Sequence, residues 1–159
     1  MQEHPEDTIR QYSHMVYRLA FARTGNRQDA DEIYQEVFLR YIRKQPVFQS
    51  DAHKKAWFLK VTVNCANSLF RSPWKRCTEP LNEALLSETE EEQPAPDLSM
   101  ALKRLPPRYR EVIHLFYYEE LSAEEIGRIL HRKPSTVRTQ LTRARSILKD
   151  ILKEESYEF

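Results

Sequence analysis

The sequence is poor in glycine and cysteine, with only two of each among its 159 residues, and it has no long apolar run. Cys65 and Cys77 lack a paired motif such as CxxC, so we expect reduced structural thiols. No stretch approaches the roughly 20 apolar residues that cross a bilayer, and no signal peptide is evident. These absences argue against direct membrane insertion and favour a cytoplasmic protein.

Catalytic signatures are also missing. The sequence contains no HExxH, no phosphate-binding P-loop, no GxSxG and no closely paired cysteines. Asp51, His53, Cys65 and Cys77 could be imagined as metal ligands or as a nucleophile–base pair, but their spacing matches no such motif. We therefore expect no enzyme, no metal site and no cofactor.

Charge is abundant but unevenly distributed. Charged residues make up 31% of the chain, yet the net charge is only +1. Residues 1–77 carry thirteen Lys or Arg against eight Asp or Glu, whereas residues 78–99 carry seven acidic residues and no basic one. Residues 100–153 carry twelve basic against six acidic residues. Two basic blocks that flank an acidic one indicate two candidate nucleic-acid surfaces joined by an anionic linker.

The most informative stretch is LSAEEIGRILHRKPSTVRTQLTRARSILK, residues 121–149, which is predicted to form two helices joined by a tight turn. Ser122 and Glu125 form a capping box at the start of the first helix. Pro134 disfavours helical geometry in the residue before it and so ends that helix. Either Pro134 at the first position or Ser135 as a cap can begin the second helix. The apolar residues of the first helix are Ala123, Ile126, Ile129 and Leu130.

The second helix of this pair separates an apolar face from a polar one. Steps of four, three and four bring the inward residues together: Val137, Leu141, Ala144 and Leu148. The side chains left outside are Thr136, Arg138, Thr139, Gln140, Thr142 and Arg143. In a helix-turn-helix, the N-terminal half of the second helix meets base edges in the major groove. Arg can bond guanine there, Gln can bond adenine, and Thr can bond either or touch a thymine methyl.

The alternative for this helix is an ordinary amphipathic helix with a solvated charged face. Here, however, a capped first helix, a four-residue turn and base-reading residue types occur together. That combination favours DNA recognition.

Two more helices are predicted near the N-terminus, over residues 8–23 and 28–43, with Gly25 as a left-handed C-cap between them. Acidic residues in the first turn of the second helix favour its dipole. That explanation suits Gln35 and Glu36 less well, because they lie deeper in the helix. The inward residues of the two helices are Ile9, Tyr12, Val16, Leu19, Ala30, Ile33, Val37 and Tyr41, and the polar face of the second carries Asp31, Glu32, Gln35 and Glu36.

A third N-terminal helix is predicted over residues 54–72, after a loop, residues 45–53, that holds Phe48. Its predicted inward residues are Ala56, Leu59, Val63, Ala66 and Phe70. The other side carries an aromatic, two cations and two amides: Trp57, Lys60, Asn64, Asn67 and Arg71. Bases stack on aromatics and cations meet phosphate, so this face suits a single strand. The alternative, in which Trp57 belongs to the core and the cations are solvated, is equally open.

The expected fold class is all-α, with two small helical domains joined by an acidic flexible linker. We expect an N-terminal helical bundle over residues 1–72, the linker over residues 73–99 and a helix-turn-helix domain over residues 100–159. The linker lacks an apolar period and suits an extended tether, although a short docking helix with Leu81, Leu85 and Leu86 is possible. In the last domain, Pro106–Pro107 should stop a short helix with Leu102 and Leu105 inward. Residues 108–118 should form the next, with Val112, Leu115 and Phe116 beneath the helix-turn-helix.

Three stretches resemble the extracytoplasmic-function (ECF) class of bacterial RNA polymerase sigma factors, in the sigma-70 family, and the resemblance covers nearly the whole chain. They are DADEIYQEVFLRYI (residues 29–42), KAWFLKVTVNCANSLFR (residues 55–71) and LKRLPPRYREVIHLFYYEELSAEEIGRILHRKPSTVRTQLTRARSIL (residues 102–148). The third alone fits other helix-turn-helix regulators. The three in this order, separated by an acidic linker, are highly specific.

The resemblance implies a promoter-specificity subunit that binds core RNA polymerase and promoter DNA and has no catalysis of its own. Asp31, Gln35 and Glu36, with Glu32 beside them, match an acidic helix that docks on a coiled coil of the polymerase's largest subunit. The linker would thread toward the polymerase's active-site and RNA-exit channels. An anti-sigma factor, often membrane-anchored in this family, is expected as a further partner.

The resemblance also assigns the promoter contacts. Phe48, Asp51 and Asn64 match a loop and helix that capture a flipped base of the downstream (−10) element, and Lys60 and Arg71 would hold nearby phosphate. Flipping costs a few kcal/mol of unstacking, which such contacts offset. The face that would read the upstream (−35) element holds Arg138, Thr139, Gln140, Thr142 and Arg143. Many family members carry an aromatic or basic residue at Gln140 and Thr142, so promoter sequence does not transfer from any one of them.

An autonomous helix-turn-helix regulator is the alternative function, with the N-terminal domain used for dimerisation or sensing. It predicts tight binding to a palindromic duplex without polymerase. A sigma factor should bind weakly alone, because one small helix-turn-helix buries little surface.

Overall fold

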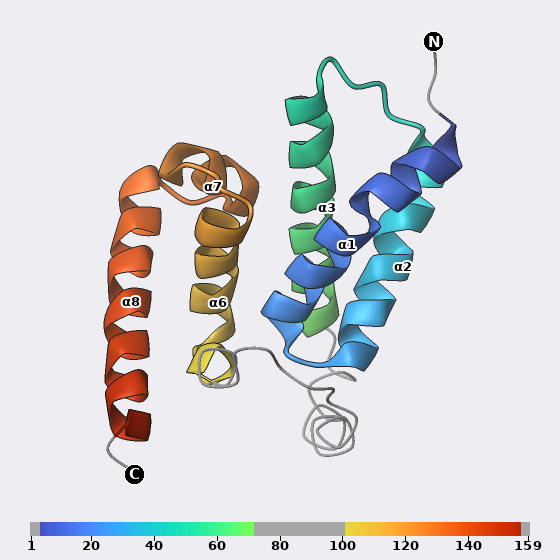
Figure 1. Cartoon of the computed structure of the whole chain (residues 1–159). Helices are drawn as coiled ribbons and strands as arrows, with labels where there is room; N and C mark the ends of the chain where they lie inside the picture. The colour runs from blue at the N-terminus through green and yellow to red at the C-terminus, as the bar shows by residue number, and fades with distance from the viewer. Residues whose placement is uncertain (1–3, 72–100, 157–159) are drawn as a thin grey trace. The chain divides into compact units, whose positions relative to one another are not determined.

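The computed structural model describes residues 4–71 and 101–156, and every regular element within these two ranges is helical (Figure 1). The chain divides into two compact units, residues 1–88 and 89–159. The prediction of an all-α fold is confirmed. The tether and docking helix predicted within residues 73–99 lie outside the described residues. The elements are α1 (Pro5–Thr24), α2 (Arg27–Lys44), α3 (Asp51–Arg71), α6 (Pro107–Ile113), η2 (His114–Tyr118), α7 (Ala123–Leu130) and α8 (Pro134–Ser156).

Local caps set the ends of α1 and α2. Gly25 ends α1 in the left-handed conformation, with φ 78°, and its N–H donates to the carbonyl of Phe21 at 2.8 Å. The next residue, Asn26, caps α2, since its side-chain oxygen accepts from the N–H of Asp29 at 2.8 Å. The predicted glycine cap is therefore confirmed, and the two helices are joined by only two residues.

The N-terminal unit is a three-helix bundle in which α3 packs against both α1 and α2 (Figure 1). Phe58 of α3 is fully buried and stacks on Tyr12 with ring centroids 4.8 Å apart. The prediction for the inward face of α3 was too narrow: Phe58, Thr62 and Cys65 are also buried, and Ala56 and Phe70 are only half-buried. A helix that contacts two neighbours needs a wider apolar face than one row of side chains provides.

A lysine also lies in this core. Lys54 is buried, its Nζ donates to the hydroxyl of Thr8 at 3.1 Å, and it lies 5.7 Å from the ring centroid of Tyr12. The hydroxyl and the aromatic face both favour the ammonium group. Sequence patterns assign such a cation to the surface.

The start of the C-terminal unit differs from the prediction at its prolines. Pro107 is the first residue of α6, so the pair that was expected to stop a helix also begins one. Proline suits a first helical position, because the N–H that it lacks has no partner there. The predicted helix over residues 108–118 instead becomes π-helical after Ile113, as η2. His114 stacks on Tyr118 within η2, with ring centroids 5.0 Å apart.

The helix-turn-helix is formed by α7 and α8. Both bonds of the predicted capping box are present: the N–H of Glu125 donates to Ser122 Oγ at 3.1 Å, and the N–H of Ser122 donates to Glu125 Oε1 at 2.9 Å. His131 ends α7 in the left-handed conformation. α8 begins at Pro134, which decides between the two predicted starts. Its buried residues are Val137, Leu141, Ala144 and Ile151, with Leu148 half-buried.

Candidate nucleic-acid interface

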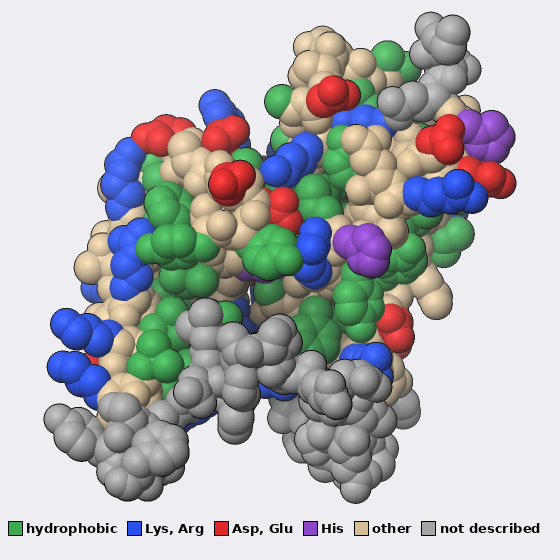
Figure 2. All heavy atoms as spheres, in the orientation of Figure 1, with side chains coloured by type: hydrophobic (Ala, Val, Ile, Leu, Met, Phe, Trp, Pro, Cys, Tyr) green, Lys and Arg blue, Asp and Glu red, His purple; other side chains and the backbone are tan. Residues whose placement is uncertain are grey.

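The polar face of α8 is open to solvent. Thr136, Arg138, Thr139, Thr142 and Arg143 are exposed and Gln140 is half-buried, and Figure 2 shows Lys and Arg side chains recurring along this helix. The hydroxyl of Thr139 donates back to the carbonyl of Ser135, and that of Thr142 donates to the carbonyl of Arg138, each at 3.0 Å. With the hydroxyl protons used within the helix, the two threonines offer methyl groups and lone pairs outward.

The two arginines of this face contact neighbouring helices. Arg138 forms an ion pair with Glu124 of α7 in which both side chains are more than half exposed. Arg143 lies beside Tyr109 of α6. Hydrogen bonding from Arg108, with a further contribution from Arg143, lowers the pKa of Tyr109. Both arginines of the recognition face are thus oriented before any DNA is bound.

A buried carboxylate behind this face was not anticipated. Glu111 of α6 has only 2% of its side chain exposed, and its Oε1 lies 2.7 Å from Nη2 of Arg132. Nη1 of Arg132 donates to Oε1 of Gln140 at 2.9 Å. In the sequence, Glu111 lies next to Val112, which was predicted to face inward. A carboxylate at that position was the one sign in the sequence that a buried ion pair could form there. The turn of the helix-turn-helix is thereby tied to α6 and α8.

Arg145 makes a second link between α8 and the rest of this unit. Its Nε donates to the Tyr117 hydroxyl at 2.6 Å, and its guanidinium lies 5.4 Å from the ring centroids of Phe116 and Tyr117. Phe116, which was predicted to pack beneath the helix-turn-helix, is half-buried, and the Arg145 guanidinium lies over its ring. The link fixes α8 against η2.

The residues assigned to the downstream element lie on α3 and on the loop before it. Phe48 packs edge-on against Trp57, with ring centroids 5.8 Å apart, and Trp57 packs edge-on against Tyr41 at 6.2 Å. Phe48 and Trp57 are both half-buried. Trp57 therefore combines the two predicted possibilities, since part of its ring joins the aromatic core and part remains open.

The polar residues of this face follow one side of α3. Lys60 and Arg71 are exposed, Asn64 and Asn67 are half-buried, and Asp51 is exposed at the first position of the helix. Their spacing of three and four residues places Trp57, Lys60, Asn64, Asn67 and Arg71 on a common side. The amide oxygen of Asn67 accepts from Nη2 of Arg23 at 3.2 Å.

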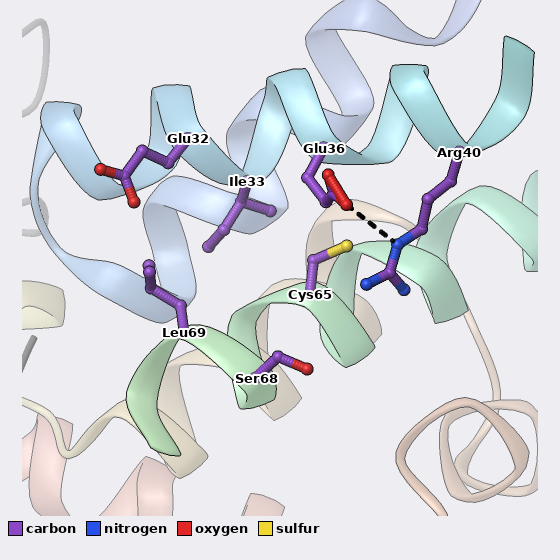
Figure 3. Close-up of a pocket in the computed structure, with 7 residues that line it drawn as sticks. All are labelled: Glu32, Ile33, Glu36, Arg40, Cys65, Ser68 and Leu69. Carbon is purple, nitrogen blue, oxygen red and sulfur yellow. Dashed lines mark ion pairs between the residues drawn. The ribbon is translucent and has the colours of Figure 1, made fainter. Parts of the chain in front are cut away.

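The polar face of α2 borders a groove against α3 (Figure 3). Asp31, Glu32 and Gln35 are exposed, and Glu36 is half-buried and pairs with Arg40 at 3.5 Å. The groove has a volume of about 320 Å³ and is lined by Glu32, Ile33, Glu36, Arg40, Cys65, Ser68 and Leu69. Burial raises the pKa of the Cys65 thiol, so the thiol is neutral at physiological pH. The groove thus has an apolar floor with acidic side chains on its rim.

Two negative findings apply to the described parts of the chain. Within residues 4–71 and 101–156, no group of three or more His, Cys, Asp or Glu side chains could hold a metal ion. No helix in these ranges combines the length and the apolar character that spanning a membrane requires.

Comparison with known proteins identifies the family. Residues 8–76 match the Sigma-70 region 2 family and residues 97–148 match the Sigma-70, region 4 family. The ECF RNA polymerase sigma factor SigE of Mycolicibacterium smegmatis is 34% identical over 164 residues, which cover 96% of this chain and 63% of SigE. RNA polymerase sigma factor SigV of Bacillus subtilis is 33% identical over 141 residues, which cover 87% of this chain and 85% of SigV.

Solved structures share the fold. The sigma factor RpoE in complex with the anti-sigma factor NepR from Bartonella quintana gives a TM-score of 0.73 at 20% identity, covering 93% of this chain and 96% of RpoE. CnrH in complex with the cytosolic domain of CnrY gives a TM-score of 0.63 at 19% identity, covering 94% of this chain and 88% of that one. The two family matches and the similarity to SigV point to the same family. The chain therefore belongs to the ECF class of the sigma-70 family, the promoter-recognition subunits of RNA polymerase.

Proposed function

We propose that this chain binds core RNA polymerase and directs initiation through two DNA-contacting faces, one on each compact unit. The face on α8 reads the −35 element as duplex, and the face on α3 with its preceding loop holds the −10 element as an opened strand. The proposal rests mainly on the exposed polar side of α8, which follows a fully capped α7. The chain itself takes no catalytic part.

At the −35 element, α8 would enter the major groove with its N-terminal half. Arg138 and Arg143 are the candidates for guanine, because their guanidinium groups are exposed and held at the sides of the face. Thr139 and Thr142 would contact thymine methyl groups, since their hydroxyl protons are already donated to the helix backbone. Thr136, in the first turn of α8, is placed for a nearby phosphate or base.

At the −10 element, the half-open aromatic pair Phe48 and Trp57 would contact an unstacked base. Asn64 and Asp51 would bond its edge, and Lys60 and Arg71 would neutralise phosphates along the same side of α3. Asn67 would contribute mainly to the stability of the helical bundle, since its amide oxygen accepts a hydrogen bond from Arg23.

Core polymerase would dock on the polar face of α2. Glu32 and Glu36 line the groove between α2 and α3, whose floor is apolar, and Asp31 and Gln35 are exposed on the same helix. Such a surface suits a basic helix, or a pair of helices, that inserts an aliphatic side chain between charged contacts. We assign this surface to the coiled coil of the polymerase's largest subunit, the partner that the family resemblance implies.

The remaining proposals concern regulation and location. RpoE and CnrH, which share the fold, were solved bound to NepR and to the cytosolic domain of CnrY. We extend this to the present chain and propose that an anti-sigma factor holds it inactive. The chain would act in the cytoplasm, where core polymerase and promoter DNA are present.

Run-off transcription with purified core polymerase and a promoter library tests the proposal as a whole. Transcripts should start only when the chain is added, and the active promoters should share two sequence elements. Without polymerase, duplex DNA should be bound weakly, because one small helix-turn-helix buries little surface. Tight specific binding to a palindromic duplex by the chain alone, with no run-off product, would instead identify an autonomous regulator.

A further inference from the structure

Arg132 connects three helices of the C-terminal unit through one guanidinium group. It lies in the turn after α7, its Nη2 is 2.7 Å from Oε1 of Glu111 on α6, and its Nη1 donates to Oε1 of Gln140 on α8 at 2.9 Å. A guanidinium carries donors and no acceptor. The atom of Gln140 that faces Arg132 must therefore be the amide oxygen, and the amide nitrogen is directed elsewhere.

The position of Arg132 is fixed at both its side chain and its backbone. The Arg132 side chain is 24% exposed and the Glu111 side chain 2% exposed, so the ion pair is largely removed from water. Breaking such a pair leaves a buried charge without its partner, which is costly. The N–H of Arg132 donates to the carbonyl of Gly127 at 2.9 Å. The orientation of the Gln140 amide is therefore set before DNA arrives.

We propose that Arg132 is a positioning residue that makes Gln140 a donor-only reader of the −35 element, which favours guanine or thymine over adenine at one position. The inference rests on the proposed function and adds to it the base class read by one side chain. It also differs from the usual pairing of glutamine with adenine.

The chemistry of the major groove supports this selection. Adenine is recognised bidentately when the amide oxygen of glutamine accepts from N6 and the amide nitrogen donates to N7. The Gln140 oxygen accepts from Arg132 in the turn, so a bidentate pair with adenine would require the amide to leave that hydrogen bond. Guanine presents two acceptors, N7 and O6, and thymine presents O4, whereas adenine presents the acceptor N7 beside its N6 amino group, a donor that disfavours a second N–H. Either base can accept from the Gln140 amide nitrogen, and Gln140 lies on the polar side of α8 with its side chain half-buried.

The test uses holoenzyme reconstituted from core polymerase and the full chain, with each position of the upstream element varied through all four bases. The wild-type protein should favour guanine or thymine over adenine by about fivefold or more at one position. Gln140→Glu keeps an oxygen on Arg132 and presents a second oxygen outward. The preference at that position should then move to cytosine or adenine, whose amino groups donate. A purely structural role for Gln140 would not exchange the preferred base.

The double variant Glu111→Gln with Arg132→Met provides the complementary measurement. It removes the ion pair without leaving an unpaired charge and without changing the net charge, so general attraction to DNA is preserved. Freed from Arg132, Gln140 should accept adenine at that position at least as well as guanine. Lys149→Ala, which removes an exposed cation from the distal half of α8, serves as the control that changes no base preference. Thermal unfolding of each variant verifies that it is folded. If the double variant does not fold, the base preference of the Gln140→Glu variant alone tests the proposal.

Two results would overturn the inference. One is a wild-type preference for adenine at the position whose preference responds to Gln140→Glu. The other is an upstream preference that the folded variants leave unchanged at every position. If the wild-type holoenzyme instead transcribes without regard to the upstream sequence, the proposed function itself fails.

Discussion

Arg23 of α1 donates a hydrogen bond from Nη2 to the amide oxygen of Asn67 on α3 at 3.2 Å, and its guanidinium lies 4.8 Å from the ring centroid of Phe70. Two residues that are 44 positions apart thus join the end of the first helix to the end of the third. The contact separates two asparagines that the sequence had grouped together. Asn67 is engaged within the bundle, whereas Asn64 makes no side-chain hydrogen bond within the described residues.

The two asparagines should therefore respond differently to alanine substitution. Asn64→Ala should weaken strand opening at the −10 element while leaving upstream binding unchanged, because a base-edge contact is lost. Asn67→Ala should lower the free energy of unfolding by about 1 kcal/mol, as expected for one hydrogen bond. Permanganate footprinting of open complexes and chemical denaturation provide the two measurements. Equal permanganate reactivity in wild type and Asn64→Ala would remove Asn64 from the opening step.

Arg138→Ala should reduce binding to promoters that carry guanine at one upstream position by about 1–3 kcal/mol, the value of a bidentate contact. Promoters with another base there should be affected less. Fluorescence anisotropy with holoenzyme and paired duplexes measures the difference, and Lys149→Ala provides a cation deletion outside the N-terminal half of α8. A uniform loss across all duplexes would mean that Arg138 contacts phosphate. Arg143→Ala is expected to behave in the same way at a different base.

Replacing Gln35 and Glu36 together by alanine should abolish co-purification with core polymerase. Gln35 is exposed and Glu36 is half-buried at the rim of the groove, and neither belongs to the buried core, so the circular dichroism spectrum and melting temperature should change little. The matched control replaces the exposed Gln11 and Glu6 of α1 by alanine and should co-purify normally. Normal assembly of the α2 variant would place the polymerase contact elsewhere on the chain.

Gly127→Ala should destabilise the C-terminal unit by about 1–3 kcal/mol, the cost of overpacking a close contact. A Cβ at this position would lie 2.5 Å from the carbonyl oxygen of Arg132, closer than van der Waals contact allows. Alanine is otherwise the better helix former by about 1 kcal/mol, so an unchanged or raised melting temperature would contradict the contact. Differential scanning calorimetry measures whether the substitution lowers or raises the melting temperature.

Cys65 should react slowly with iodoacetamide. Burial raises the pKa of its thiol, and only the thiolate is nucleophilic. In a Cys77→Ser background, the labelling rate should remain below that of a free cysteine and should rise at a higher pH than the rate of the free amino acid. Addition of urea should abolish the difference. Rapid labelling of the folded protein at neutral pH would contradict the burial of this side chain.

Much of this fold follows from short-range signals that a single sequence carries. Gly25 and the pair Ser122 and Glu125 were identified from their residue types, because a left-handed cap and a capping box depend on only a few neighbouring atoms. The apolar steps of α8 were found for the same reason. Periodicity was less successful in α3, where Phe58 and Cys65 are buried outside the predicted row of inward residues, because this helix packs against two others.

The charged contacts were the part that sequence could not supply. Lys54 and Glu111 can be buried because each has a partner distant in the chain. Lys54 donates a hydrogen bond to Thr8, and Glu111 forms an ion pair with Arg132. Nothing in the local pattern identifies such partners. The recognition face was predicted as a set of outward side chains, whereas the structure adds how Gln140 is oriented by its neighbour. The roles of these residues at promoter DNA and polymerase remain predictions for the experiments above.

The two-residue link Gly25–Asn26 between α1 and α2 bears on how the protein is made. Helices joined so closely meet through contacts of small sequence separation, and topologies dominated by such contacts fold quickly. All three helices of the N-terminal bundle are complete by Arg71, long before the last residue is synthesised. The bundle is thus expected to assemble on the ribosome, and a nascent chain could present its α2 groove to a partner while the helix-turn-helix is still being translated.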